Sequence, residues 1–231
     1  PPKRRQLIVL PAPDKASQAL LAEREAWSLE QTGVDAGLPE RWDDATYAQR
    51  VDMMSGTLAA ALGAIAKQRQ AVALRKVPAV VEHALIAMEE VDRVIVWTHH
   101  HEVTDALAAG LCDAGVERVL VADGRSHPEE RQDLVATFQS AKTVRTVAVL
   151  GLHAMGVGLT LTRGSFVIFA ELDWVPALIT QAEDRCHRIG QREAVLVQHL
   201  VMDGSVDAVL ARMLMRKQAI ADRALNMERR T

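Results

Sequence analysis

The chain of 231 residues changes its hydrophobic pattern at about residue 78. From there on, short apolar runs that fit strands alternate with amphipathic stretches that fit helices. The expected strands are residues 94–97, 119–121, 146–150, 166–169 and 196–200, and the expected helices are residues 79–91, 102–114, 128–139, 175–188 and 205–225. Continuous apolar runs separated by helix-length segments predict a parallel sheet covered by helices on both faces. The predicted fold class is therefore α/β.

The segment before residue 78 has a different pattern. Residues 14–77 are rich in Ala, Gln, Glu and Arg, and their apolar side chains recur at helical spacing. Gly33 to Pro39 interrupts this spacing, so we interpret the region as a helical hairpin or α-helical insertion near the N-terminus. The expected organisation is residues 1–13, the insertion at 14–77, the main lobe at 78–203 and a terminal helical segment at 204–231.

Composition and charge limit the function. With 49% apolar and 25% charged residues, the chain fits a soluble protein with a real core. The net charge of −3 gives no global basic field, and 3% aromatic residues argue against a surface that stacks bases. Cys112 and Cys186 belong to no Cys-x-x-Cys pair, so no disulfide framework or zinc ribbon is expected. No apolar run approaches transmembrane length, and we expect no membrane partner.

The strongest candidate chemistry lies in residues 181–191, which read Gln-Ala-Glu-Asp-Arg-Cys-His-Arg-Ile-Gly-Gln. On a helix, Gln181, Arg185 and Arg188 would project from one face, and two arginines presented together match phosphate oxygens. The alternative is a solvated helix face on which Glu183 and Asp184 pair with the arginines.

This string fills every fixed position of motif VI in the Swi/Snf-type DNA translocases of helicase superfamily two, which the chain therefore resembles. The resemblance implies a RecA-like C-terminal helicase lobe. It also implies that Arg185 and Arg188 act as catalytic arginine fingers on ATP held by another lobe. Gln181 and Asp184 are the candidate ATP-binding residues of the same string.

Other segments follow the family order. Residues 94–100 resemble motif IV, residues 123–125 resemble its Asp-Gly turn, and residues 151–161 occupy the motif V position. In motif V, Gly156 and Gly158 are further candidate ATP contacts, because small residues let the backbone approach a phosphate closely. The candidate DNA contacts are Thr98, His99, Asp123, Gly124, Arg125 and Thr160.

The consecutive histidines 99–101 suggest a metal site as an alternative. Neighbouring residues at a strand end point in different directions, so we expect no metal ligand here. Motif V also departs from the family, which usually has Ala-Gly-Gly-x-Gly where this chain has His153-Ala154-Met155-Gly156-Val157-Gly158. Its Gly-Leu-Thr ending is most similar to the annealing-helicase branch.

The flanking segments also fit the family. Asp173 and Trp174 match the Asp-Trp-x-Pro element, to which we assign a structural role at the start of the motif VI helix. By the same resemblance, residues 1–10 are a strand after the inter-lobe linker, and the terminal helix is a brace across the lobes; the alternative for this helix is an ordinary amphipathic core helix.

Phosphoryl transfer needs parts that this sequence lacks. There is no Gly-Lys-Ser/Thr, no glycine before any lysine and no Asp-Glu pair. The chain also starts at Pro1 without a Met, so we expect an N-terminal RecA-like lobe upstream to hold ATP and Mg²⁺. The chain alone should be inactive, whereas the parent should be a DNA-dependent ATPase that tracks duplex or forked DNA through its backbone. Such a motor would be nuclear in a eukaryote, or cytoplasmic and nucleoid-associated in a prokaryote or virus.

Two rival functions remain. A degenerate lobe kept as a DNA- or protein-interaction module would come from a parent without a phosphate loop. A different nucleotide-binding α/β enzyme, such as an oxidoreductase, fits less well, because Leu161 stands where a dinucleotide fingerprint needs its third glycine.

Overall fold

The computed structural model describes residues 1–12, 44–140, 144–155, 159–173, 175–205, 207–208 and 211, with side chains of the first helix described from residue 66. Two compact units are distinguished, one of residues 1–11 and 73–231 and the other of residues 12–72. The expected break at Gly33 to Pro39 and most of the terminal helix lie outside the described residues.

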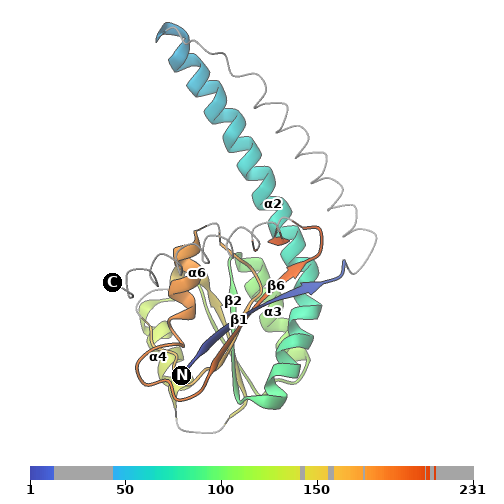
Figure 1. Ribbon diagram of the computed structural model, residues 1–231, viewed down its shortest axis with the longest axis vertical. Coiled ribbons are helices and arrows are strands. Elements are labelled where there is room, and N and C mark those ends of the chain that lie inside the picture. Colours follow the sequence, from blue (N-terminus) through green and yellow to red (C-terminus); the bar gives the residue numbers. More distant parts are fainter. Residues whose placement is uncertain are drawn as a thin grey trace, which may run out of the picture. The chain divides into compact units, whose positions relative to one another are not determined.

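Within the described residues, the first unit contains a parallel sheet of six strands (Figure 1). The strands are β1 (Lys3–Leu10), β2 (Arg93–Thr98), β3 (Arg118–Ala122), β4 (Thr146–Gly151), β5 (Phe166–Phe169) and β6 (Val195–Met202). Their order is β1-β6-β5-β2-β4-β3, and every neighbouring pair is parallel. All five strands predicted from the apolar runs are confirmed, and β1 forms where the family resemblance places a strand.

Helices cover both faces of this sheet. They are α2 (Asp44–Glu90), α3 (His101–Asp113), α4 (Pro128–Gln139), α5 (Leu152–Met155) and α6 (Pro176–Glu183). On β2, Val94 and Val96 pack in one core with α3 and the end of α2, whereas Ile95 and Trp97 pack in a second core with α4, α5 and α6. The period of two along the strand separates these two cores. None of the described helices is both long and apolar enough to span a bilayer.

The central strands carry most of the core. Every residue of β2 and of β4 is buried, as expected for parallel strands covered on both faces. The rings of Trp97 and Phe169 stack at 6.4 Å between centroids. A side chain at Gly164 would place its Cβ 2.7 Å from Cδ1 of Ile95, so any larger residue there would force the buried Ile95 side chain to move.

Helix α2 does not break where the sequence pattern changes. A separate helix was predicted for residues 79–91, but the structure has one helix of 47 residues with Pro78 inside it. Proline removes the hydrogen bond to the carbonyl four residues earlier, which belongs to Leu74. Pro78 and Leu74 are both exposed, so water can solvate that carbonyl and the helix continues.

A buried lysine, Lys76, fixes the C-terminal part of α2 against the sheet. Nζ of Lys76 donates to the carbonyls of Ala170 (2.7 Å) and Leu200 (2.9 Å) and pairs with Oδ2 of Asp207 at 2.5 Å. The side chains of Lys76 and Asp207 are only 1% and 3% exposed, so the ammonium is fully desolvated. Its three partners satisfy its three donors.

Candidate functional site

Helix α6 ends earlier than the sequence predicted. A helix was expected to reach residue 188, but α6 stops at Glu183 with Asp184 as its C-cap. The N–H of Arg185 and of Cys186 donate three residues back, to Ala182 and Glu183, which is the pattern of a turn. Residues 184–190 are therefore turns and a bend, and Arg185 and Arg188 do not share a helical face with Gln181.

This turn segment, residues 184–190, packs against the end of motif V. Nε of Arg185 donates to the carbonyl of Gln181 at 3.1 Å, and its Nη1 donates to the carbonyl of Leu159 at 3.2 Å. Nη1 of Arg188 lies 3.5 Å from Oγ1 of Thr160. The structure thus brings Arg185, Arg188 and Thr160 together. The exposed side chain of Gln181 lies at the last turn of α6.

The two acids beside these arginines pair with β1. Glu183, whose side chain is 1% exposed, accepts hydrogen bonds from two nitrogens of Arg5, at 2.6 Å from Nη2 and at 2.8 and 2.9 Å from Nε. Lys3 lies 2.9 Å from both Glu183 and Asp184. Burial would raise the pKa of Glu183, but the hydrogen bond from Arg5 and the charge of Lys3 outweigh it, so the pKa is lowered.

The alternative in which Glu183 and Asp184 neutralise the arginines is therefore wrong. Among the described residues, neither Arg185 nor Arg188 forms a salt bridge, although Glu183 and Asp184 are close to them in sequence. The carboxylate of Asp184, a candidate ATP contact, is held by Lys3 in this conformation.

His199 on β6 is a buried histidine close to the carboxylate of Glu183. Its Nε2 is 3.7 Å from Oε1 of Glu183, and its ring stacks on Phe169 at 4.8 Å. Burial lowers the pKa of His199 to about 4, even though the charge of Glu183 acts in the opposite direction. The imidazole is therefore neutral at pH 7.

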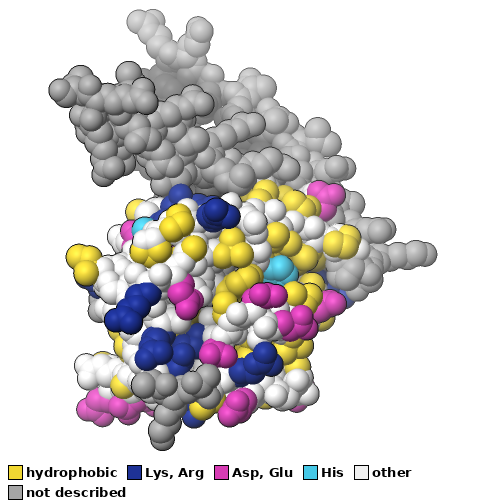
Figure 2. Space-filling model, turned by 60° about the horizontal axis from the view of Figure 1, so that its bottom comes forward, with side chains coloured by type: hydrophobic (Ala, Val, Ile, Leu, Met, Phe, Trp, Pro, Cys, Tyr) yellow, Lys and Arg dark blue, Asp and Glu magenta, His cyan; other side chains and the backbone are white. Residues whose placement is uncertain are grey.

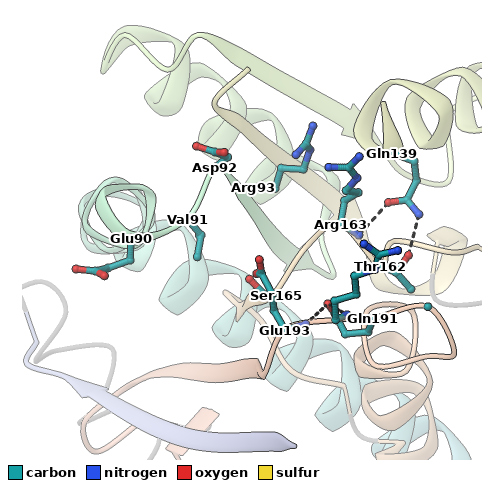
Figure 3. Close-up of a pocket in the computed structure, with 12 residues that line it drawn as sticks. Glu90, Val91, Asp92, Arg93, Gln139, Thr162, Arg163, Ser165, Gln191 and Glu193 are labelled. Atoms are coloured by element: carbon teal, nitrogen blue, oxygen red, sulfur yellow. Dashed lines mark hydrogen bonds between the residues drawn. The ribbon is translucent and has the colours of Figure 1, made fainter. Parts of the chain in front are cut away.

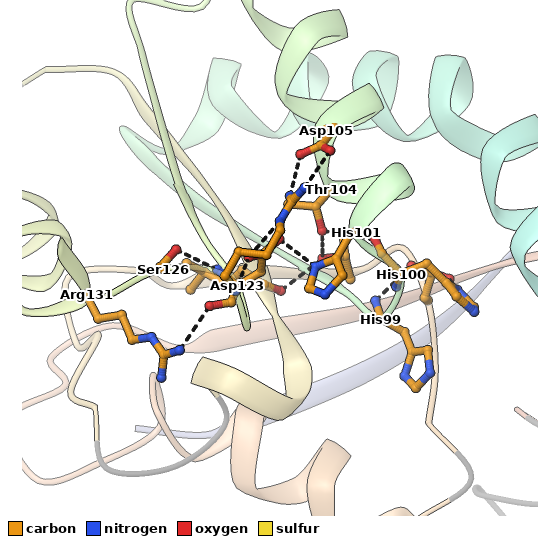
Figure 4. Close-up of polar contacts among 12 residues, drawn as sticks. His99, His100, His101, Thr104, Asp105, Asp123, Ser126 and Arg131 are labelled. Atoms are coloured by element: carbon orange, nitrogen blue, oxygen red, sulfur yellow. Dashed lines mark hydrogen bonds and ion pairs between the residues drawn. The ribbon is translucent and has the colours of Figure 1, made fainter. Parts of the chain in front are cut away.

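The three histidines of the loop after β2 face three different carboxylates. Nδ1 of His99, His100 and His101 faces Asp173, Glu171 and Asp123, at 3.3, 2.6 and 2.8 Å respectively. In Figure 4 the rings of His99 and His101 lie apart and point in different directions. Thr98, a candidate DNA contact, is fully buried and shares its hydroxyl with Thr104 at 2.7 Å, so that hydroxyl is not presented at the surface.

Sequence reasoning missed the role of Glu171 in this loop. Its Oε2 accepts the backbone N–H of His99 (2.8 Å) and His100 (2.9 Å), and its Oε1 contacts the His100 ring. Burial would raise the pKa of Glu171, but these hydrogen bonds from His99 and His100 lower it overall. A buried anion after β5 therefore positions the backbone of the loop after β2.

The Asp-Gly element forms the predicted turn after β3. Oδ1 of Asp123 accepts the N–H of Arg125 at 2.8 Å, and the carbonyl of Asp123 accepts from Ser126. The guanidinium of Arg125 pairs with Asp123 (2.7 Å) and with Asp105 (2.6 Å) (Figure 4). Burial would raise the pKa of Asp123, but the hydrogen bonds from Arg125 and His101 lower it to about 2. Gly124 is exposed at the tip of this turn.

Part of motif V can be located. Gly156 and Gly158, the remaining candidate ATP contacts, lie outside the described residues. The short helix α5, which the sequence did not predict, places Nε2 of His153 2.9 Å from Oδ2 of Asp173. Asp173 thus contacts His99 and His153, which are 54 residues apart in the chain.

A cavity of about 580 Å³ lies at the amino ends of β2 and β5, opposite the carboxyl ends that carry the loops described above (Figure 3). Arg93 and Ser165 line it where β2 and β5 begin, and Gln139 bridges Thr162 and the backbone of Arg163. Gln191 also lines this cavity and donates to the carbonyls of Gly164 and Cys186. The last residue of motif VI therefore has a structural role, because it ties the turn segment to the chain entering β5.

On the face shown in Figure 2, basic and acidic side chains are interspersed. This agrees with the net charge of −3 and leaves recognition to local groups.

Comparison with known proteins decides the family. A family model described as the helicase conserved C-terminal domain matches residues 75–190, which is half of the chain and includes β2 to α6 and the turn segment. The chain belongs to this helicase C-terminal family. Its parallel sheet agrees with the solved C-terminal part of the Fun30 ATPase domain, at a TM-score of 0.50 and 26% identity over 55% of this chain and 40% of that one. The RecA-like fold expected from the resemblance is confirmed.

The relatives of this helicase lobe belong to the Swi/Snf type. The mouse DNA annealing helicase and endonuclease ZRANB3 is 32% identical over 98% of this chain and 19% of its own length. The Drosophila melanogaster SWI/SNF-related matrix-associated actin-dependent regulator of chromatin subfamily A-like protein 1 is 35% identical over 63% of this chain and 19% of its own length. The lobe therefore spans about a fifth of these curated relatives.

Proposed function

We propose that this chain is the C-terminal motor lobe of an ATP-dependent DNA translocase or remodeller. The observation that carries the proposal is the state of Arg185 and Arg188. Both extend from the turn segment without a carboxylate partner among the described residues, while their acidic neighbours are bound by Lys3 and Arg5. A guanidinium left without an internal anion is available to an external one, and its geometry matches phosphate.

In this proposal the two arginines complete an ATP site that another lobe begins. That lobe holds the triphosphate and Mg²⁺, and the ion supplies charge neutralisation on the phosphates. Arg185 and Arg188 approach when the lobes close and stabilise charge on the transferred phosphoryl group. Gln181 supports them, and Asp184 acts through its pair with Lys3, which positions the turn segment against β1.

DNA contact falls to the loops after β2 and β3 and to Thr160. The backbone of these loops is positioned by buried anions, Glu171 for one and Asp123 for the other. The proposed partner is the phosphate backbone of duplex or forked DNA, which needs no base readout. The names of the relatives, a DNA annealing helicase and a chromatin regulator, support a motor of the DNA-remodelling kind.

The test is DNA-stimulated ATP hydrolysis by this chain alone and by the chain joined to the segment that precedes it in its parent. We expect no turnover by the chain alone and robust turnover by the joined protein. Silence in both would favour the interaction module, and turnover by the chain alone would contradict the proposed division of the site.

A further inference from the structure

Three side chains from separate loops converge at the carboxyl ends of neighbouring strands. His99 follows β2, His153 lies on α5 directly after β4, and Asp173 follows β5. The sheet order places β2 between β5 and β4, which is why these residues meet. Each offers one ligand atom, and the three atoms lie within 4.8 Å of one another.

Both imidazoles address the same carboxylate oxygen. Nδ1 of His99 is 3.3 Å and Nε2 of His153 is 2.9 Å from Oδ2 of Asp173. The Nδ1 atom of His99 is buried and makes no hydrogen bond among the described residues. This ring nitrogen therefore faces Oδ2 of Asp173 without the geometry of a hydrogen bond. The other oxygen of Asp173 accepts the N–H of Val175 at 2.8 Å, which is the outer hydrogen bond that orients a metal-binding carboxylate.

We propose that His99, His153 and Asp173 bind a divalent transition-metal ion of the Zn²⁺ class. Two imidazole nitrogens and one carboxylate oxygen suit such an ion, and three protein ligands leave at least one position for water. A tetrahedral ion with bonds of about 2.1 Å needs ligand atoms roughly 3.4 Å apart. The 3.3 Å separation of His99 and Asp173 already matches this, and rotation of His153, whose side chain is 58% exposed, adjusts its distances to both.

The bound ion would join the loops after β2, β4 and β5 into one unit. This goes beyond the proposed ATPase, whose Mg²⁺ belongs to another lobe, and it departs from the sequence-based expectation of no metal. His153 is decisive, because it stands in the part of motif V where this chain differs from the family pattern.

The test titrates Zn²⁺ and Co²⁺ into the chelator-treated 231-residue chain, followed by calorimetry and by the visible spectrum of bound Co²⁺. We expect a single saturable site whose affinity falls at least about tenfold in His153→Asn and in Asp173→Asn. The matched control is His101→Asn, since His101 is also half exposed and pairs with one carboxylate.

Zn²⁺ should also raise the melting temperature of the wild type and of His101→Asn but not of His153→Asn. Equal affinity in wild type and His153→Asn, or no saturable binding by the folded wild-type chain, would overturn the site. Neither readout depends on ATP hydrolysis.

Discussion

Two turns of this lobe each have an arginine close in sequence to an acidic residue. They differ in whether the arginine pairs with that acid. In the turn after β3, Arg125 is enclosed by Asp123 and Asp105. In the turn segment after α6, Arg185 and Arg188 have two acids next to them in sequence, yet those acids are bound by Lys3 and Arg5.

The difference shows how a fold assigns the same residue type to different tasks. A guanidinium satisfied by internal carboxylates organises its own loop, and binding an outside phosphate would require it to leave them. A guanidinium whose neighbouring acids are occupied elsewhere keeps its charge for an outside anion. In the proposed motor, the basic residues of β1 would contribute to the ATP site indirectly, because they bind Glu183 and keep it from pairing with Arg185 or Arg188.

The comparison is tested most strongly by Arg188→Ala in the two-lobed parent. If Arg188 acts on ATP, the substitution should lower DNA-stimulated ATPase by about a thousandfold or more. DNA affinity, measured by fluorescence anisotropy, should change less than about twofold. The control is Arg192→Ala, an exposed arginine just beyond the same turn segment. Wild-type turnover by Arg188→Ala would contradict the assignment.

Glu183→Gln tests whether the pairing with β1 matters for stability. This substitution removes the buried carboxylate that pairs with both Arg5 and Lys3, and breaking a buried pair costs about 3 kcal/mol at the low end of the usual range. The low end applies because the Arg5 side chain is 33% exposed. Urea unfolding of the chain measures the effect. Asp105→Asn, which breaks an exposed pair, should cost below about 1 kcal/mol, and equal losses would remove the contrast.

The two regions should also respond differently to acid. His199, under Glu183, has a pKa lowered to about 4, so between pH 6.5 and 4 the unfolded chain binds a proton that the folded chain does not. Stability therefore falls as pH falls, by about 2 kcal/mol between pH 7 and pH 5.

His199→Gln should flatten that part of the stability profile, whereas His101→Gln in the other region should not. Asp123, with its pKa lowered to about 2, contributes stability that is complete above about pH 4 and is lost only as pH falls toward 2. An unchanged slope between pH 7 and 5 in His199→Gln would show that His199 does not cause it.

The smallest expected effect follows from releasing Arg125. Asp105→Asn removes its exposed partner and leaves Arg125 paired with Asp123 alone, so the guanidinium can reach a DNA phosphate more easily. Affinity of the joined protein for duplex DNA should rise about threefold, with a salt dependence steeper by roughly one phosphate contact. The control is Asp113→Asn, which removes an exposed charge from the end of α3, the helix that also carries Asp105. Equal gains in both variants would reflect net charge alone.

The sequence predicted the sheet well because its strands are buried on both faces and therefore read as continuous apolar runs. It placed the end of α6 wrongly because Gly190 marks only the outer limit of a helix. What stops α6 at Glu183 is long-range: the N–H of Leu161 donates to the carbonyl of Arg185, and Gln191 holds the far end of the turn segment. No local signal encodes those contacts.

The candidate site was predictable only in part, because the sequence encodes its contiguous motifs but not the contacts between distant segments. Motif VI and the Asp-Gly turn are contiguous strings and could be recognised. His99, His153 and Asp173 come together because of the strand order β5-β2-β4, and no local pattern in the sequence predicts this order. Likewise, an exposed Pro78 looks like a helix boundary until the face on which it lies is known.

The contacts of Lys76 fix which face of α2 is turned toward the sheet. Each residue inserted or deleted between Lys76 and β2 would turn the earlier part of the helix by about 100° and direct this ammonium away from Ala170, Leu200 and Asp207. An unpaired charge in that position is prohibitive, whereas changes of length before Lys76 leave the contact intact. In evolution, the contact of Lys76 sets no limit on the length of the chain before the buried residues Arg69, Val72 and Ala73, while the 16 residues between Lys76 and β2 must keep their number.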